Sequence, residues 1–302
     1  MIEAATPLFS VVIPSYNHGR YIGRALQSVM DQTYFNWEVI VIDNHSTDNT
    51  DEVISSFADS RIGYLKIHNN GVIAVSRNAG IRVAKGVWIA FLDSDDWWTN
   101  DKLQVCFERI NDNVDLVYHD LETVNNKHGK VERSTQRTRQ VMPPVIMDLL
   151  LNGNAISNSS AIVRKTIIDK IGGINEKKEM TASEDFNTWV RISRISEQFI
   201  YIPKTLGFYL AHESNISNKE DMSLNMECAF SEFMHLLTSS QQNRINANFC
   251  YMRGRQAYCK NDHPNAIKNL RFVARHGRIM YVIKSIYMIA NISIKRCFKT
   301  KQ

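Results

Sequence analysis

Residues 86–98 are GVWIAFLDSDDWW, and this stretch decides the fold that we expect. Its first half contains an apolar run, Val87–Leu92, which is typical of a buried strand. An acidic cluster follows at once: Asp93, Ser94, Asp95 and Asp96. Three carboxylates within four residues repel one another, and a hard divalent cation would balance their charge. A solvated acidic turn is the alternative interpretation.

Strands and helices alternate on both sides of this stretch. Four further apolar runs predict strands at residues 9–13, 38–42, 62–67 and 115–118. Helical spacing and N-cap residues predict the helices 21–30, 46–57 and 72–84. Such alternation indicates an α/β fold with a mostly parallel sheet and helices on both faces. Because ligands lie beyond the carboxyl ends of such strands, we expect Asp43 to meet the acidic cluster there.

The rest of the chain is less regular. Residues 125–142 are polar and predict a loop. The elements expected after it are helices at 144–151 and 165–171, a helix that begins at Ser183 or Glu184, and strands at 159–163, 199–202 and 205–210. From residue 219 onward the pattern is helical, with helices expected at 251–258, 264–276 and 280–294.

Length and composition bound the class of protein. At 302 residues, with 44% hydrophobic and 22% charged residues, the chain can bury one large core and a smaller appendage. The N-terminus lacks the pattern of a secretory signal, and no apolar run is long enough to predict a transmembrane helix. Five cysteines without CxxC spacing favour reduced thiols. We therefore expect a cytoplasmic protein.

The C-terminal region is strongly basic. From Arg244 onward the chain has thirteen Lys or Arg residues and one acid, Asp262, whereas the net charge of the whole chain is only +5. A basic amphipathic helix near residues 280–294 predicts peripheral contact with an anionic membrane surface. Packing of its apolar face on the rest of the protein is the alternative. Aromatic residues are not interleaved as a stacking platform, so we expect no nucleic-acid partner.

Two further polar clusters have a structural and a functional interpretation. The loop Asp43–Asp48 could present backbone N–H groups to a nucleotide, or could only cap the next helix. The pair Glu184 and Asp185 could supply a general base, or could only complement the dipole in the first turn of a helix.

The sequence resembles a known family in several motifs that occur in the same order. Residues 9–50 are FSVVIPSYNHGRYIGRALQSVMDQTYFNWEVIVIDNHSTDNT, and residues 75–103 are VSRNAGIRVAKGVWIAFLDSDDWWTNDKL. Together with Gly172–Glu176, Glu184-Asp185 and the spacing of His212 and Ser217, they resemble the inverting family 2 glycosyltransferases of the GT-A fold. The resemblance covers residues 8–217, and it implies a nucleotide-sugar donor.

The resemblance also implies residue roles, position by position. The donor-binding residues would be Pro14, Ser15, Tyr16, Asp43, Asn44, Arg77, Asp93, Ser94, His212 and Ser217. The ligands of Mn²⁺ or Mg²⁺ would be Asp95, the principal one, with Asp93 and Asp96. The catalytic base would be Asp185, with Glu184 as the second candidate.

This chain departs from the family pattern after its second strand. Family members usually have Asp-Asp-Gly-Ser, whereas this chain has Asp43-Asn44-His45-Ser46. An Asn carbonyl still accepts a hydrogen bond from a nucleobase, but without charge. His45 replaces a glycine and restricts the backbone of the loop.

These observations lead to one expected function and two alternatives. The expected enzyme moves a sugar, with inversion, from a nucleotide diphosphate sugar, a UDP-sugar, to an acceptor hydroxyl. The acceptor would be a glycan or a lipid-linked molecule in the biosynthesis of a surface polysaccharide such as O-antigen or capsule. The expected location is the inner face of the cell membrane. The parts of the enzyme would be a nucleotide-sugar-binding subdomain (1–120), an acceptor-binding subdomain (121–218) and a basic helical extension (219–302). The alternatives are an inactive sugar-nucleotide-binding or scaffold protein and a sugar nucleotidyltransferase.

Overall fold

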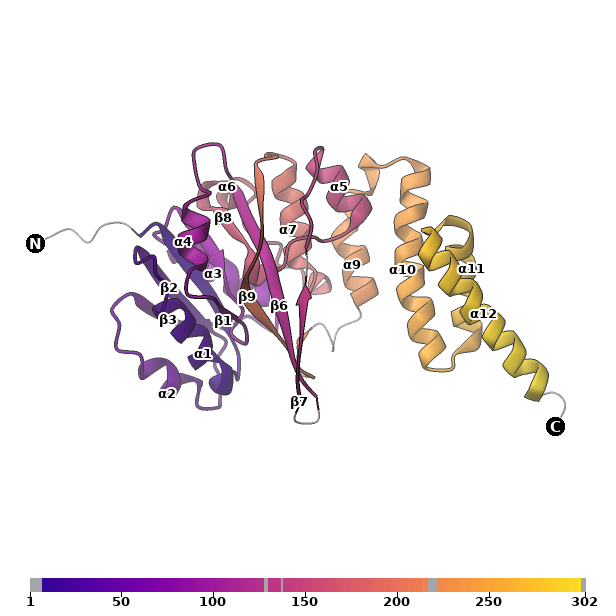
Figure 1. The fold of residues 1–302 in the computed structure, drawn as a ribbon, viewed down its shortest axis with the longest axis horizontal. Helices are drawn as coiled ribbons and strands as arrows, with labels where there is room; N and C mark the ends of the chain where they lie inside the picture. The colour runs from indigo at the N-terminus through magenta and orange to yellow at the C-terminus, as the bar shows by residue number, and fades with distance from the viewer. Residues whose placement is uncertain (1–6, 128–129, 137, 214, 217–221, 300–302) are drawn as a thin grey trace, which may run out of the picture. The chain divides into compact units, whose positions relative to one another are not determined.

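The computed structural model describes residues 7–127, 130–136, 138–213, 215–216 and 222–299. The chain divides into two compact units, Met1–Glu220 and Asp221–Gln302. The first contains the sheet and the second is helical (Figure 1). Each unit is described by itself.

The described part of the first unit contains one mixed sheet. Its strands are β1 (Phe9–Ser15), β2 (Trp37–Asp43), β3 (Ile62–Lys66), β4 (Trp88–Phe91), β5 (Trp97–Trp98), β6 (Leu116–Lys127), β7 (Lys130–Gln136), β8 (Ile162–Arg164) and β9 (Phe199–Ala211). The strand order is β3-β2-β1-β4-β8-β6-β9-β5, and β7 pairs with β6. The helices of this unit are α1 (Gly19–Met30), α2 (Thr50–Ser55), α3 (Ile73–Val83), α4 (Lys102–Phe107), α5 (Val145–Asn152), α6 (Lys165–Lys170) and α7 (Glu184–Ser193).

The N-terminal half of the sheet is parallel, as the sequence predicts. Strand β1 pairs in parallel with β2 and with β4, and β2 pairs in parallel with β3. In this register Ser15 lies opposite Asp43. The carboxyl ends of β1, β2 and β4 therefore meet at one edge of the sheet, where the acidic segment follows β4.

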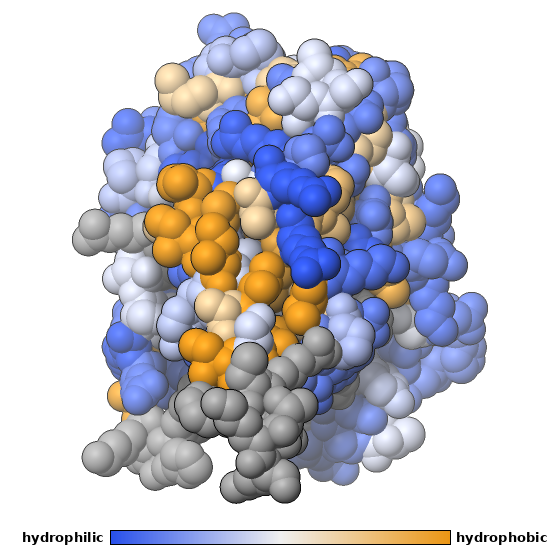
Figure 2. Space-filling model, turned by 90° about the vertical axis from the view of Figure 1, so that its right-hand side faces the viewer, coloured by the Kyte–Doolittle hydropathy of each residue, from blue (hydrophilic) through white to orange (hydrophobic). Residues whose placement is uncertain are grey.

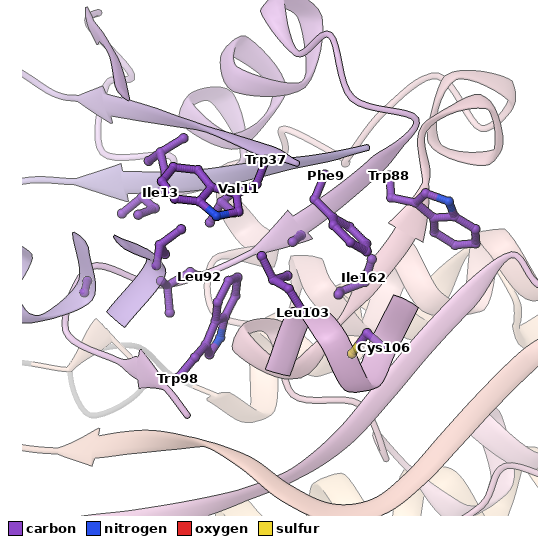
Figure 3. Close-up of a cluster of buried hydrophobic side chains, with 14 of the residues drawn as sticks. Phe9, Val11, Ile13, Trp37, Trp88, Leu92, Trp98, Leu103, Cys106 and Ile162 are labelled. Carbon is purple, nitrogen blue, oxygen red and sulfur yellow. The ribbon is translucent and has the colours of Figure 1, made fainter. Parts of the chain in front are cut away.

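Helices cover both faces of this parallel half because successive side chains of a strand point to opposite faces. Val11 and Ile13 pack with residues of α1 in the main core, which Figure 3 shows together with Trp37, Trp88 and Trp98. Val12 and Ile42 face α3 instead. A Cβ added at Gly80 of α3 would lie 2.6 Å from Ile42 Cδ1, so a glycine allows this close approach.

The second half of the sheet is mixed. Strand β8 is antiparallel to β4 and to β6, whereas β9 is parallel to β6 and antiparallel to β5. We expected two strands around Pro203, but β9 is one strand. His119 of β6 pairs with Ile202 and Asp120 with Thr205, so Pro203 lies in a register shift and does not interrupt the strand.

The expectation of a loop at residues 125–142 is wrong in part. Strand β6 continues to Lys127, and β7 pairs with it antiparallel from Lys130 to Gln136. Residues 131–135 are exposed, so this hairpin has no apolar alternation from which it could be predicted.

The second unit consists of helices, as expected. They are α9 (Met222–Ser231), α10 (Ser239–Cys259), α11 (His263–His276) and α12 (Ile279–Lys299). A capping box at Thr238 and Gln241 begins α10. Ala266 and Leu270 of α11 pack with Met288 and Ile292 of α12 in a small core. Among the helices described, none is both long and apolar enough to cross a membrane.

Candidate active site

Two loops at the carboxyl ends of β1 and β2 are held together by hydrogen bonds. The Asn17 side chain accepts from Thr47 N at 2.8 Å, and Gly19 N donates to Asp48 Oδ2 at 2.9 Å. Asn17 has a positive φ of 51°. The sequence Tyr16-Asn17-His18-Gly19 therefore forms a fixed turn between β1 and α1.

The residues expected at the nucleobase lie together at this edge. Asp43 is buried, and both of its carboxylate oxygens accept hydrogen bonds from Ser46, from N at 2.8 Å and from Oγ. Asn44 N donates to Ser15 O at 2.9 Å, and Asn44 Oδ1 accepts from Asn69 N at 2.9 Å. Asp43 thus shapes the loop, while Asn44 lies between the ends of two strands.

Pro14 and Ser15 are buried, whereas Tyr16 is exposed. His45, at the position where the resemblance leads one to expect glycine, has a φ of 52° and stacks on His68, with ring centroids 3.8 Å apart. The loop thus keeps the left-handed backbone that a glycine would adopt easily, and the stacked rings hold the replacement in place.

The acidic segment after β4 separates into carboxylates with different surroundings. Asp96 is buried, its Oδ2 accepts from Ser159 Oγ at 2.6 Å, and its Oδ1 accepts from Leu210 N at 3.0 Å. Burial, with the charges of Asp95 and Asp93, raises the pKa of Asp96 well above its ordinary value. Asp96 therefore ties the segment to β9 and to the turn that precedes β8.

Arg77 of α3 joins the acidic segment to α7. Its Nη2 lies 2.7 Å from Asp93 Oδ1, and its Nη1 forms an ion pair with Glu184 Oε1. Arg77 is 3% exposed and Glu184 is 4% exposed. Asp93 Oδ1 also accepts from Asn158 Nδ2 at 3.0 Å. A single guanidinium thus brings together two acids that are 91 positions apart in the sequence.

Asp185 differs from its neighbour Glu184 in exposure and partners. It is half-buried, its Oδ1 accepts from Phe186 N at 2.6 Å, and its Oδ2 accepts from Asn154 Nδ2 at 3.2 Å. Burial, and then the charge of Glu184, raises the pKa of Asp185 to about 7. A carboxylate with this pKa can take up a proton near neutral pH, whereas Glu184 is held by Arg77.

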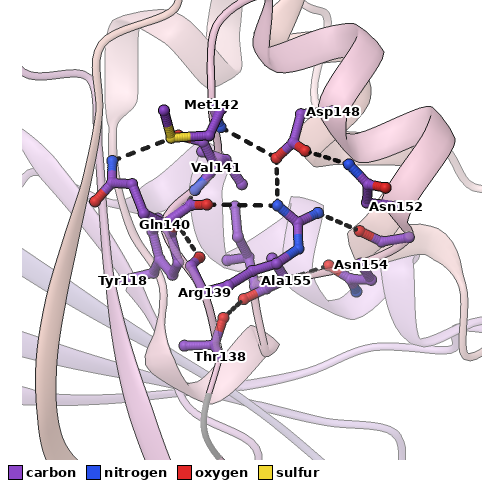
Figure 4. Close-up of polar contacts among 12 residues, drawn as sticks. Tyr118, Thr138, Arg139, Gln140, Val141, Met142, Asp148, Asn152, Asn154 and Ala155 are labelled. Carbon is purple, nitrogen blue, oxygen red and sulfur yellow. Dashed lines mark hydrogen bonds and ion pairs between the residues drawn. The ribbon is translucent and has the colours of Figure 1, made fainter.

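The segment that carries Asn154 is fixed by a polar network, shown in Figure 4. Arg139 forms an ion pair with Asp148 and donates from Nη2 to Gly153 O at 3.2 Å. Asp148 Oδ2 also accepts from Met142 N at 3.1 Å. This network holds the backbone immediately before Asn154, and so it supports the contact with Asp185.

Aromatic and imidazole rings surround Asp95. His212 Nε2 lies 2.9 Å from Asp95 Oδ2, and the His212 ring stacks on Tyr21. His18 Nδ1 lies 2.7 Å from Ser94 Oγ, and burial lowers the pKa of His18. Residues from the β1–α1 turn, the acidic segment and the end of β9 therefore converge on one point.

Asp95 has one neighbouring side chain, His212, that could share a divalent cation with it. Within the described residues, no group of three or more His, Cys, Asp or Glu side chains is arranged as a metal site. However, a carboxylate oxygen of Asp95 and an imidazole nitrogen of His212 lie together, and both are donors that Mn²⁺ accepts. Such cations often take few protein ligands and complete their coordination with phosphate oxygens and water.

The structure thus gathers most of the residues that sequence reasoning selected. Asp93, Arg77 and Glu184 are in direct contact, and Asp95 contacts His212; Ser217 lies outside the described residues. Sequence reasoning missed His18, Asn154 and Asn158 as parts of the site. Short polar residues in loops are common, so no signal distinguished them before their partners were known.

Comparisons with known proteins identify the family of this chain. The sequence profile described as "Glycosyl transferase family 2" matches residues 10–172. The UDP-Glc:alpha-D-GlcNAc-diphosphoundecaprenol beta-1,3-glucosyltransferase WfgD of Escherichia coli is 40% identical over 120 residues, 39% of this chain and 47% of that protein. The putative teichuronic acid biosynthesis glycosyltransferase TuaG of Bacillus subtilis is 43% identical over 100 residues, 32% of this chain and 40% of that protein. The matched segments span less than half of either relative.

Solved structures share the GT-A fold with this chain. S. aureus TarS 1–349 in complex with UDP-GlcNAc has a TM-score of 0.67 at 19% identity, over 89% of this chain and 81% of that one. The mannosyltransferase PcManGT from Pyrobaculum calidifontis, in complex with GDP-Man and Mn²⁺, has a TM-score of 0.59 at 16% identity, over 97% of this chain and 82% of that one. At these identities the likeness shows the fold alone.

Proposed function

The chain belongs to glycosyl transferase family 2, and from this membership we propose that it transfers a sugar from a UDP-sugar to an acceptor hydroxyl with inversion at the anomeric carbon. The observation that carries the proposal is the bridge that Arg77 makes between Asp93 and Glu184. This contact supports the assignment of the acidic segment after β4 and of the acid pair at the start of α7 to one site.

Asp185 is the proposed general base. An acceptor hydroxyl is a weak nucleophile, so a carboxylate must accept its proton as the oxygen attacks the anomeric carbon. The hydrogen bonds from Asn154 and Phe186 orient the Asp185 carboxylate. Glu184 is not suited to this role because its Oε1 is paired with Arg77 and its side chain is buried.

The donor would bind along the edge from Tyr16 and Asn44 to Asp95. Asn44 Oδ1 can accept a hydrogen bond from the uracil N3–H. Asp93 and Ser94 would contact the ribose or the sugar. His212 and His18 lie beside Asp95, where the diphosphate would be released. A bound Mn²⁺ or Mg²⁺ would neutralise the negative charge that develops on the diphosphate.

The acceptor would bind on the side of residues 121–218, and residues 1–120 would hold the donor. A lipid-linked glycan is the proposed acceptor class, because WfgD, which is similar to 39% of this chain, acts on a diphosphoundecaprenol-linked sugar according to its name. The proposed setting is surface-polysaccharide biosynthesis at the inner face of the cell membrane. The basic character of the second unit supports this location.

A nucleotide-release assay tests the proposal. The full chain is screened against UDP-sugars by thermal shift with Mn²⁺ present, because a ligand that binds only the native state raises the Tm. Donors that bind are then incubated with and without a GlcNAc-diphosphate-lipid acceptor. We expect UDP release and a product heavier by one sugar only when the acceptor is present.

Two other results would contradict the proposal. Donor binding without UDP release, across a panel of acceptors, would indicate an inactive sugar-nucleotide-binding protein. Release of pyrophosphate from a nucleoside triphosphate and a sugar phosphate would indicate a nucleotidyltransferase instead.

A further inference from the structure

Helix α12 buries one side and exposes an apolar side. Ser285, Met288 and Ile292 are buried, and Met288 and Ile292 pack against α11. The opposite side carries large apolar side chains that are more than half exposed: Ile279, Met280, Ile283, Ile286, Tyr287 and Ile294. Most of these positions recur at intervals of three or four residues, so they form one stripe along the helix. We call them the α12 stripe.

The charge around the α12 stripe has a single sign. From His263 to Gln302 the sequence contains nine Lys or Arg residues and no Asp or Glu. On α11, Lys268, Arg271 and Arg275 are exposed and recur at the spacing of one helix face. Figure 2 shows a contiguous apolar patch on this side of the molecule, bordered by a run of strongly hydrophilic side chains.

We propose that the α12 stripe, together with the exposed basic residues of α11, is the surface by which this protein binds an anionic lipid bilayer. Apolar side chains of an interfacial helix enter the boundary between headgroups and acyl chains, while lysine and arginine contact anionic headgroups. No described helix can cross a bilayer, so α12 would lie in the plane of the interface.

Charge selects a bilayer over a second copy of the chain. Two α12 stripes in contact would bring together two regions that each have nine basic residues and no acid. Like charges oppose that association, whereas they favour contact with anionic lipid. A soluble protein rarely leaves so many large apolar side chains together in water unless another surface covers them.

The proposed surface deepens the proposed function, because it would bring the site to a lipid-linked acceptor. Its test is nevertheless independent of that function. Binding to vesicles needs no donor, no acceptor and no turnover, so failure of the surface and failure of the chemistry are distinguishable.

The experiment is flotation of the full chain with vesicles of phosphatidylcholine alone and with vesicles that also contain phosphatidylglycerol. The disrupting variant is Ile283→Glu with Ile286→Glu. The matched control is Gln256→Glu with Cys259→Glu, which adds the same charge at the same spacing on exposed positions of α10. A third variant, Lys268→Gln with Arg271→Gln and Arg275→Gln, removes charge only. Circular dichroism and light scattering report the fold and the oligomeric state of each.

We expect the wild type to float with phosphatidylglycerol vesicles, and less at high salt because salt screens the headgroups. Ile283→Glu/Ile286→Glu should bind at least about tenfold more weakly than Gln256→Glu/Cys259→Glu, since charge on the apolar face opposes insertion. At about fivefold for each basic side chain, the triple variant should lose on the order of a hundredfold. Absence of wild-type flotation, or equal flotation of the two glutamate pairs, would overturn the proposal. So would a wild-type dimer that Ile283→Glu/Ile286→Glu dissociates.

Discussion

Replacing Arg77 by methionine removes the group that joins α3, the acidic segment and α7. Methionine keeps much of the side-chain volume, so the main change is the loss of charge and of hydrogen bonds. Asp93 and Glu184 then face each other without a counter-charge, and Glu184 is only 4% exposed. Breaking a buried ion pair from one side costs about 3–5 kcal/mol.

The expected effect is large enough to measure simply. In a domain of this size, each kcal/mol lowers the Tm by about 2–4 °C, so the Tm of Arg77→Met should fall by roughly 10 °C. Urea unfolding followed by tryptophan fluorescence gives the free energy of unfolding directly. The matched control is Arg82→Met on the same helix, where the side chain is exposed and a change within about 0.5 kcal/mol is expected.

A double-mutant cycle separates the ion pair from other effects of losing Arg77. Glu184→Gln removes the buried negative charge that Arg77→Met leaves unpaired. The double variant should therefore be more stable than the sum of the single changes implies, by about 1–3 kcal/mol. Equal stability of Arg77→Met and Arg82→Met, or strict additivity in the cycle, would refute the reasoning.

Three further predictions concern turnover. Burial raises the pKa of Asp185 to about 7, and only the ionised carboxylate can accept a proton. We therefore expect kcat/KM to fall about tenfold for each pH unit below about 7. A kcat/KM that does not change with pH in this range would contradict the prediction. Asp95→Ala should abolish the UDP release that a divalent cation stimulates, whereas Asp31→Ala, at an exposed position, should keep it. Full activity of the wild type in excess chelator would exclude a role of the cation in catalysis. Arg139→Met should lower kcat roughly tenfold and leave the Kd of the donor unchanged, because the backbone that carries Asn154 loses its support. A tenfold rise in the Kd of the donor would argue against this local effect.

The sequence predicted the parallel half of the sheet because its signals there are local. Apolar runs such as Val87–Leu92 end in polar clusters, and helical spacing fills the intervals between them. The β6–β7 hairpin escaped prediction because residues 131–135 are all exposed and show no alternation of apolar and polar side chains. The single strand β9 escaped it because Pro203 is normally a strand breaker, and only the register with β6 accommodates it.

The candidate site was predicted as a set of positions and not as a set of contacts. The placement of Asp93 after a strand and of Asp185 at a helix start could be inferred from pattern and resemblance. The different roles of Glu184 and Asp185 could not be inferred from the sequence. Whether Glu184 or Asp185 is available to a substrate depends on Arg77, which is 107 residues before Glu184, and on Asn154. Such partners are fixed by tertiary packing alone.

The most direct test of the central claim compares turnover and donor affinity in Asp185→Asn. Asparagine keeps the shape of the side chain but cannot take up the proton of the acceptor hydroxyl. We expect kcat to fall by about 10²–10⁴ while the Kd for the UDP-sugar is unchanged, and we expect Asp169→Asn, at an exposed position of α6, to change neither. Wild-type turnover in Asp185→Asn would contradict it.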